Sequence, residues 1–274
     1  MKKFQVLAFF RYYWRACTIY DIHSPYLFAL VESLMDQKLY YAMSEIEPYR
    51  DRYKTNSTQI KLLDFGAGGN SGKLKTVAQI VKTASSRPQK CRFIFNLVKY
   101  FQPESILELG TNLGIATAYM SMAHSNSKLY TVEADPGIVE HAEELFSNLN
   151  IKQRIEVINT SFQTFFRNEN KIIDSIDFAF VDGDHSFEST IDTVSRLMRN
   201  SQDRKVLILD DIYWSKPMHE AWIKIKDKYS DCLFIELMHM GIIIKDEKCP
   251  ISETVSLIPW KLKPWRIGLT SGKH

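Results

Sequence analysis

The stretch from Ser105 to Gly114, which reads SILELGTNLG, constrains this chain more than any other. A short apolar run carrying one acid, Glu108, leads into a glycine turn, and the residues after Gly114 (IATAYMSMAH) have the composition of a helix. A strand, a glycine turn and a helix in this order place backbone N–H groups and a helix N-terminus at the carboxyl edge of a parallel sheet. The stretch therefore predicts a ligand-binding turn.

An alternation of strands and helices follows this turn. Strands are expected at 105–110, 128–133, 154–159, 176–181, 205–210, 232–238 and 241–246, and helices at 114–124, 136–148, 161–168, 186–199 and 216–228. Such alternation is typical of a doubly wound parallel sheet. The last two strands are separated only by His239 and Met240, and so short a link permits only an antiparallel pair. The sequence predicts a mostly parallel α/β sheet that ends in an antiparallel hairpin.

Length and composition set the broad class of protein. The chain has 274 residues, of which 45% are hydrophobic and 24% charged, as in soluble globular proteins with a large core. A net charge of +3, without a basic stripe, argues against a nucleic-acid partner. The cysteines are far apart and form no CxxC pair, which is typical of free thiols in a reducing compartment. They are Cys17, Cys91, Cys232 and Cys249.

No apolar run approaches the about 20 residues of a transmembrane helix. The apolar start of the chain is interrupted by Arg11 and Arg15, and no small-residue cleavage site follows it. We therefore expect a cytoplasmic protein without stable membrane insertion.

The first residues predict an amphipathic helix bearing Phe4, Leu7, Phe10, Arg11 and Trp14. We expect its aromatic face to pack on the main domain. The alternative is a helix that lies on a membrane surface or forms a dimer.

A second helix is predicted to begin at Pro25, with Ser24 as its cap. Helical patterns are also expected over 74–84 and 91–101, leading into the main domain.

Residues 61–73, KLLDFGAGGNSGK, imitate a second nucleotide-binding turn. Gly72-Lys73 resembles the end of a phosphate-binding loop, but Ala67 stands where that loop needs glycine and Leu74 where it needs Ser or Thr. No acid ends a second strand some 20 residues later, as a ribose-binding fold would require. The segment is predicted to be a flexible loop, or alternatively a lid over the site.

Glu133 ends the strand that follows the first turn, 19 residues after Gly114. An acid there reaches the ribose hydroxyls of an adenosine cofactor. The turn lacks a glycine at position 112, where a dinucleotide fold brings pyrophosphate close to the backbone. An acid at Glu108 also suits a cationic ligand better than a pyrophosphate. Together these residues favour a sulfonium cofactor.

The motifs ELGTNLGIATAYM, YTVEADP, FVDGDHSFES and LILDDIYW together resemble the class I S-adenosylmethionine-dependent methyltransferases. Within that class they are most similar to the metal-dependent O-methyltransferases, which are related to the catechol and caffeoyl-CoA enzymes and to bacterial proteins with a DGDH motif. The resemblance covers residues 91–250. It implies a Rossmann-like seven-stranded sheet, mostly parallel, with a C-terminal antiparallel hairpin and here an N-terminal helical cap.

The same resemblance implies S-adenosyl-L-methionine as cofactor and assigns residues to it. The residues expected to line the cofactor are Glu108, Gly110, Thr111, Gly114, Glu133, Ala134, Thr160, Ser161 and Asp182, with Asn159 nearby. Within this set, Asp182 is expected near the methionyl end, and the 159–161 turn and Ala134 near the adenine.

Three acids, Asp182, Asp210 and Asp211, end two strands that the sheet is expected to place side by side. Oxygen ligands suit Mg²⁺ or another hard divalent cation, and the metal-dependent relatives use acids here. The alternative for the Asp210-Asp211 pair is a helix N-cap. Asp184 is a further acid that could serve as a ligand, a substrate contact or a solvated surface residue.

His185 stands three residues after Asp182, where the metal-dependent relatives place a general base. A histidine with a pKa near neutrality could take the proton of a substrate hydroxyl. The alternative is that His185 caps the helix beginning near Ser186.

The function predicted from these residues is O-methylation of a small-molecule hydroxyl. The prediction includes a divalent cation that assists the reaction. The expected domains are a helical cap and linker over 1–90, a cofactor-binding domain over 91–250 and a tail over 251–274. A homodimer through the N-terminal helix is a further expectation. Two alternatives stay open, a catalytically silent cofactor-binding or regulatory protein of the same fold and an NAD-dependent oxidoreductase.

Overall fold

The computed structural model describes residues 2–62, 73–199, 204–249 and 252–266. Its contacts group the chain into two compact units. The continuous unit is Asp36–Gly183, and the split unit combines Met1–Met35 with Asp184–His274. These units differ from the domains expected at 1–90, 91–250 and 251–274, a division that follows function rather than contacts and stays a prediction.

The continuous unit contains four parallel strands in the order β6-β3-β4-β5. The strands are β3 (Ser105–Leu109), β4 (Lys128–Glu133), β5 (Ile155–Asn159) and β6 (Phe178–Val181). The chain runs outward from β3 through β4 to β5 and then returns to pair β6 on the other side of β3. The direction of winding therefore reverses at β3, and ligands of open α/β sheets bind at the carboxyl end of such a strand.

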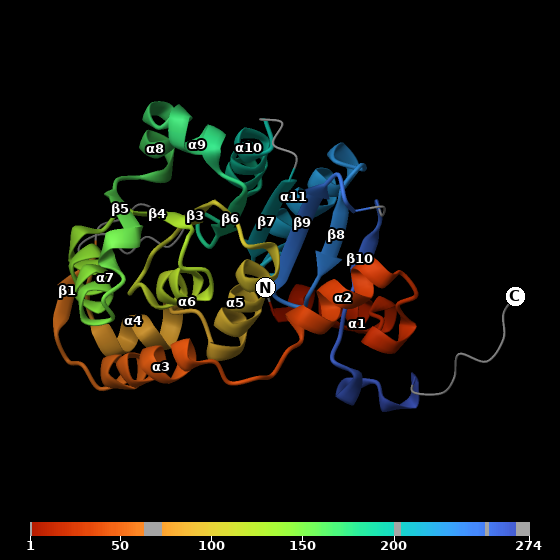
Figure 1. Cartoon of the computed structure of the whole chain (residues 1–274), viewed down its shortest axis with the longest axis horizontal. Helices are drawn as coiled ribbons and strands as arrows, with labels where there is room; N and C mark the ends of the chain where they lie inside the picture. The colour runs from red at the N-terminus through yellow and green to blue at the C-terminus, as the bar shows by residue number, and fades with distance from the viewer. Residues whose placement is uncertain (1, 63–72, 200–203, 250–251, 267–274) are drawn as a thin grey trace, which may run out of the picture. The chain divides into compact units, whose positions relative to one another are not determined.

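Helices cover both faces of these strands. They are α3 (Tyr41–Lys54), α4 (Val77–Ala84), α5 (Pro88–Phe101), α6 (Ile115–Ala123), α7 (Pro136–Asn148), α8 (Phe162–Asn168) and α9 (Asn170–Ser175), with a 3-10 turn η2 (Lys152–Arg154). Figure 1 shows α5 and α6 on one face of the four strands and α8 and α9 on the other. Helix α5 packs on α6, and α3 packs on both α4 and α6.

Helix α7 and strand β4 have the predicted bounds, because their ends carry local signals. The Asp135 side chain accepts hydrogen bonds from the N–H groups of Gly137 and Ile138, and Pro136 occupies the first helical position.

The prediction of a helix over 74–84 is wrong at its start. Residues Leu74–Thr76 form strand β2, which pairs antiparallel with β1 (Gln59–Lys61). Residues 63–72, which contain most of the sequence that resembles a second nucleotide-binding turn, lie outside the described residues.

The split unit contains four more strands in the order β10-β8-β9-β7. These are β7 (Arg204–Asp210), β8 (Leu233–Glu236), β9 (Met240–Asp246) and β10 (Thr254–Ser256). Strand β9 pairs antiparallel with both β7 and β8, so the predicted hairpin is confirmed. Strand β10 pairs parallel with β8 and adds a strand to the seven expected.

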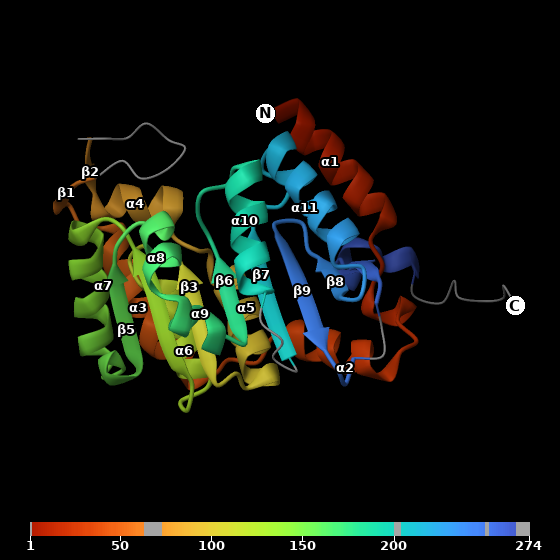
Figure 2. The same ribbon diagram turned by 90° about the horizontal axis from the view of Figure 1, so that it is seen from above.

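The helices of this unit come from both ends of the chain (Figure 2). They are α1 (Lys2–Arg15), α2 (Pro25–Leu34), α10 (Phe187–Leu197) and α11 (Lys216–Lys228), with 3-10 turns η1 (Ile19–Asp21), η3 (Trp260–Leu262) and η4 (Pro264–Arg266). Helix α2 begins as predicted, since Ser24 accepts a hydrogen bond from the N–H of Leu27 and Pro25 follows it. Among the described residues, no helix combines the length and apolarity that crossing a membrane requires.

The expected packing of the aromatic face of α1 is wrong. The helix buries Ala8, Tyr12 and Ala16, whereas Phe10 and Trp14 keep 63% and 83% of their surface exposed. Residues 8, 12 and 16 are spaced by four and share one face of a helix, so the small side chains and one tyrosine make the contact. Phe10 and Trp14 lie on the outer face.

Candidate functional site

The turn after β3 requires glycine at two positions. Gly110 has φ 103°, and a Cβ atom there would lie 2.3 Å from the carbonyl oxygen of Asp182. Gly114, the N-cap residue of α6, has φ 76°, and its Cβ would lie 2.7 Å from the ring of Phe146. Other residues rarely adopt such angles, and here they would also clash with backbone or with a packed ring. The turn is therefore a tight cradle with no room for side chains at these two positions.

Glu108 lies directly beneath this turn and is fully buried. Its Oε2 atom accepts hydrogen bonds from the hydroxyls of Thr117 and Thr131, the latter at 2.6 Å. Its Oε1 atom has no hydrogen-bond partner among the described residues. Burial raises the pKa of this carboxyl to about 8, against the lowering effect of the two threonine hydroxyls. A buried acid with a raised pKa and one oxygen without a hydrogen bond is typical of a ligand-binding site.

Glu133 connects the end of β4 to the same turn. Its carboxylate accepts the N–H of Asn112 at 3.0 Å and the N–H of Asp135 at 3.1 Å. Burial raises its pKa, and the backbone N–H groups oppose that rise. Each carboxylate oxygen can accept more than one hydrogen bond, so the group keeps capacity for ribose hydroxyls.

The turn after β5 also reaches Glu133. The N–H of Thr160 donates to the carbonyl oxygen of Glu133 at 3.1 Å, and the Asn159 amide donates to the same oxygen at 2.8 Å. Ser161 caps α8 by accepting the N–H of Thr164 at 3.2 Å. The structure therefore brings the predicted residues at 133–134 and 159–161 together, and it gives Ser161 a structural task.

Asp182 follows β6 and completes this side of the cradle. Its N–H donates to the carbonyl oxygen of Leu109 at 2.9 Å, which holds it against the Gly110 turn. Its carboxylate forms an ion pair with Lys90 at 3.0 Å and accepts a hydrogen bond from Ser86 at 3.4 Å. A small hollow beside it is lined by Ser85, Ser86, Gly110, Thr111, Asn112, Leu113, Ile115, Ala116 and Asp182.

Lys90 is the site residue that the sequence reasoning missed. It lies in the first turn of α5, two residues after Pro88. The positive end of the helix dipole disfavours a cation in that position. A lysine in this unfavourable position could have indicated an ion pair with an acid outside the helix.

His185 and its neighbours belong to the split unit. The cap of α10 is Ser186, whose hydroxyl accepts the N–H of Ser189 at 3.3 Å. The alternative that His185 caps this helix is therefore wrong. Asp184 has φ 41°, and its carbonyl oxygen accepts the N–H of Ser186 at 2.7 Å. This local bend precedes the helix, so His185 sits in a loop rather than in the first helical turn.

Asp210 and Asp211 lie at the end of β7. Asp210 is buried and its backbone pairs with Met240 of β9. Asp211 has φ 56°, and its N–H donates to the carbonyl oxygen of His239 at 2.6 Å. The alternative that these acids cap the next helix is wrong, because Ser215 caps α11 through the N–H of Met218.

The acids predicted to bind a cation are divided between the units, with Asp182 in the continuous unit and Asp210 and Asp211 in the split unit. Lys90 already neutralises the carboxylate of Asp182. Across the described ranges, no group of three or more His, Cys, Asp or Glu side chains is arranged to hold a metal ion. Cation binding at Asp182, Asp210 and Asp211 stays a prediction from the sequence.

One segment of the chain is similar to a known protein family. Residues 107–212 match the family model of a methyltransferase domain. This segment contains the Gly110 turn, Glu133, Asp182 and the acids after β7. The comparison with curated proteins gives no match.

Solved structures share the fold. A provisionally named O-methyltransferase from Klebsiella pneumoniae aligns with a TM-score of 0.53 and 15% identity, over 80% of this chain and 94% of that one. The O-methyltransferase from Bacillus cereus in complex with SAH aligns with a TM-score of 0.52 and 16% identity, over 78% and 94% of the two chains. A provisionally named caffeoyl-CoA O-methyltransferase from Staphylococcus aureus gives 0.52 and 14%, over 61% and 88%. The chain has the class I methyltransferase fold, as the sequence predicted.

Proposed function

We propose that this chain, a methyltransferase domain on a class I methyltransferase fold, transfers the methyl group of S-adenosyl-L-methionine to a hydroxyl of a small molecule. The observation that carries the proposal is the cradle at the end of β3. Gly110 clears the space above the turn, buried Glu108 lies beneath it with one oxygen unused, and Glu133 lies across from it. These are the features that an adenosine cofactor with a cationic end requires.

The residues present fit the cofactor, and each has a separate task in the proposal. Glu133 accepts hydrogen bonds from the ribose hydroxyls, and Thr160, Ser161 and Ala134 border the adenine. Glu108, Gly110, Thr111 and Gly114 form the floor and the turn. A cation beside Glu108 favours the ionised carboxylate, since it offsets the burial that raises its pKa. Asp182 lies at the methionyl end, where Lys90 fixes its carboxylate.

Methyl transfer then requires mainly that the acceptor oxygen be positioned in line with the methyl group. The bound cofactor supplies a methyl group on a sulfonium, which makes that carbon electrophilic. The acceptor oxygen forms a bond to the methyl carbon as the carbon–sulfur bond breaks, and alignment of the two supplies most of the acceleration. His185 takes the proton from the acceptor hydroxyl. It lies in the loop that precedes the Ser186 cap of α10.

A divalent cation at Asp182, Asp210 and Asp211 remains part of the proposal only as an assisting group. No step above depends on it. We expect the acceptor to be a small molecule, with the N-terminal helices and the 61–90 segment shaping its pocket. We also propose that the protein is a cytoplasmic enzyme and that it forms a homodimer.

Cofactor binding is tested by calorimetry with S-adenosylhomocysteine and with NAD. We expect the first to bind and the second not to bind, because the turn lacks the middle glycine that a pyrophosphate needs. Tight NAD binding without a response to S-adenosylhomocysteine would overturn the proposal in favour of an oxidoreductase.

Turnover is tested with labelled S-adenosylmethionine over a panel of phenols, catechols and other hydroxyl compounds. His185→Ala is expected to lower methyl transfer by roughly 10²-fold or more, the usual contribution of a general base, while cofactor affinity is kept. Asp182→Asn should also lower turnover and retain cofactor binding. His23→Ala, at an exposed histidine outside the proposed site, is the control. Cofactor binding with no methylated product across the panel would favour the catalytically silent alternative.

A further inference from the structure

Helix α1 exposes a stripe of apolar side chains that begins with a lysine. Lys3, Leu7, Phe10 and Trp14 follow one another at helical spacings of four, three and four residues, so they share a face. Leu7, Phe10 and Trp14 keep 52%, 63% and 83% of their surface exposed, and Val6 beside them keeps 56%. Globular helices bury such a stripe, and an exposed one marks an interaction surface.

The C-terminal turns extend this stripe with further aromatic residues. Trp260, Leu262 and Trp265 of η3 and η4 keep 40%, 56% and 52% of their surface exposed. They lie far from α1 in the sequence, yet the structure joins them to it. The hydroxyl of Tyr13 donates to the carbonyl oxygen of Leu262 at 2.8 Å, and the rings of Tyr13 and Trp265 are 6.3 Å apart.

Buried contacts keep the two segments together. Lys263 is buried and donates to the carbonyl oxygen of Ala16 at 2.6 Å. The hydroxyl of Tyr12 donates to the carbonyl oxygen of Leu257. The two segments that carry the exposed tryptophans are thus held against each other.

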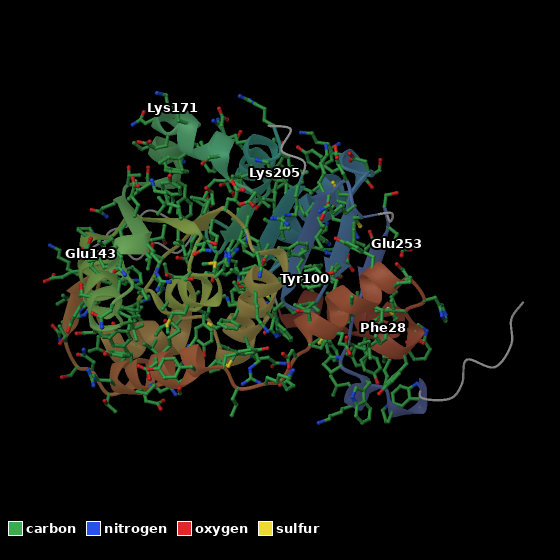
Figure 3. All side chains as sticks on the ribbon, viewed as in Figure 1. Phe28, Tyr100, Glu143, Lys171, Lys205 and Glu253 are labelled. Atoms are coloured by element: carbon green, nitrogen blue, oxygen red, sulfur yellow. The ribbon has the colours of Figure 1, made fainter. Side chains whose placement is uncertain are left out.

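The charged residues of these two segments have one sign. Residues 1–20 and 254–274 contain no Asp or Glu, whereas they contain several Lys and Arg residues. Exposed Lys3, Arg11 and Lys261 lie on these two segments. The nearest acid in the sequence to the C-terminal segment, Glu253, lies at the opposite end of β10 from η3 (Figure 3).

We propose that this aromatic-basic surface, formed by Lys3, Val6, Leu7, Phe10, Arg11 and Trp14 of α1 with Trp260, Lys261, Leu262 and Trp265, docks the protein onto an anionic lipid bilayer. Tryptophan and phenylalanine beside lysine and arginine are the composition of interfacial segments, because aromatic rings insert at headgroup level and the cations meet acidic lipids.

The docking is peripheral. Helix α1 has 14 residues, which at 1.5 Å each is about 21 Å, short of the roughly 30 Å hydrocarbon core. A second copy of the chain is the less favoured occupant. A two-fold dimer through this surface would bring its own basic residues together, and like charges across an interface oppose association.

The test is flotation of the full chain with vesicles of phosphatidylcholine alone or of phosphatidylcholine mixed with phosphatidylserine, followed also by tryptophan fluorescence. We expect binding to the phosphatidylserine vesicles, weaker binding to neutral vesicles, a blue shift of the emission, and a loss of binding as salt rises. Phe10→Ser with Trp14→Ser and Trp265→Ser should lower the partition coefficient at least tenfold. Lys3→Glu with Arg11→Glu and Lys261→Glu should abolish the preference for phosphatidylserine.

Leu39→Ser with Tyr41→Ser is the matched control, since both side chains are strongly exposed, at 82% and 73%, but lie on the continuous unit. All substituted side chains are on the surface, and thermal unfolding verifies that each variant folds. Equal vesicle binding by the wild type and the aromatic variant would overturn the proposal. So would light scattering that shows a dimer which this variant splits, with no vesicle binding by either protein.

Discussion

Glu108 in the continuous unit and Glu236 in the split unit are two acids that folding removes completely from water. Glu236 accepts hydrogen bonds from the Trp222 indole at 2.8 Å, Lys226 at 2.6 Å and Ser256 at 2.8 Å, with Tyr213 and Arg15 nearby. Glu108 is bonded through one oxygen only.

The pKa values follow this difference. Burial would raise the pKa of Glu236, but the bonds and charges around it lower it to about 2. Burial dominates at Glu108 and raises its pKa to about 8. The comparison teaches that equal burial does not mean an equal role. Glu236 ties α11, β10 and the end of α1 to the end of β8, whereas Glu108 keeps an unused oxygen under a turn that we assign to a ligand.

The largest expected effect comes from removing the satisfied acid. Glu236→Ala leaves Lys226 and the Trp222 N–H without their buried acceptor. We expect a loss of about 3–5 kcal/mol in the free energy of unfolding, the usual cost of breaking a buried charge network by deleting one partner. Denaturation in urea measures it. Glu143→Ala, at an exposed ion pair with Lys152 (Figure 3), should change stability by less than about 1 kcal/mol. Equal effects of the two substitutions would contradict the structural role of Glu236.

The pH dependence of stability should have opposite signs at the two acids. The pKa of Glu108 is raised from 4.5 to about 8, so its contribution to stability is full below pH 4.5 and is lost as pH rises to 8. Glu108→Gln should therefore stabilise the cofactor-free protein increasingly over this window, by up to about 1.4 kcal/mol per pH unit. Thermal unfolding between pH 5 and 9 measures the difference.

Glu236 should respond at the acid end instead. Its pKa is lowered from 4.5 to about 2, so its contribution is present above pH 4.5 and is lost as pH falls to 2. Glu236→Gln should flatten the acid limb of the stability profile and leave the alkaline limb unchanged. If the two glutamine variants had the same dependence of stability on pH, the proposed difference between Glu108 and Glu236 would be wrong.

The smallest expected effect concerns Lys90. Lys90→Met leaves the carboxylate of Asp182 without its ion pair, and we expect a loss of about 1 kcal/mol in stability because the pair is only partly buried. The same change should strengthen Mg²⁺ or Mn²⁺ binding about tenfold, since a cation no longer competes with the ammonium group. Titration calorimetry measures both metals, with Lys82→Met on the outer face of α4 as control. Tight Mg²⁺ binding by the wild type, unchanged in the variant, would count against this competition.

Much of the fold could be predicted because its signals are local. Pro136 with the Asp135 cap fixed the start of α7, and Pro25 with Ser24 fixed that of α2. The glycine turn and the acid at Glu133 could be predicted from spacing alone, since both belong to one strand–turn–helix–strand unit.

The remaining features depend on partners distant in the sequence. Strand β10 is three residues, TVS, and is a strand only because β8 lies beside it. Lys90 pairs with Asp182 across 92 positions, and Glu236 collects donors from α11 and β10. The outward aromatic stripe of α1 was missed because an amphipathic pattern does not say which face meets the core.

The split unit is assembled from both ends of the chain, with the continuous unit inserted between them. During synthesis, residues 36–183 therefore emerge before the split unit is complete, and α1 must wait until Leu257 and Lys263 have been made. We expect a chain on the ribosome to present Tyr12 and Ala16 of α1 before the C-terminal residues that contact them have been made. Pulsed hydrogen exchange during refolding should show β3–β6 protected before α1, and a nascent chain should need a chaperone most in that interval.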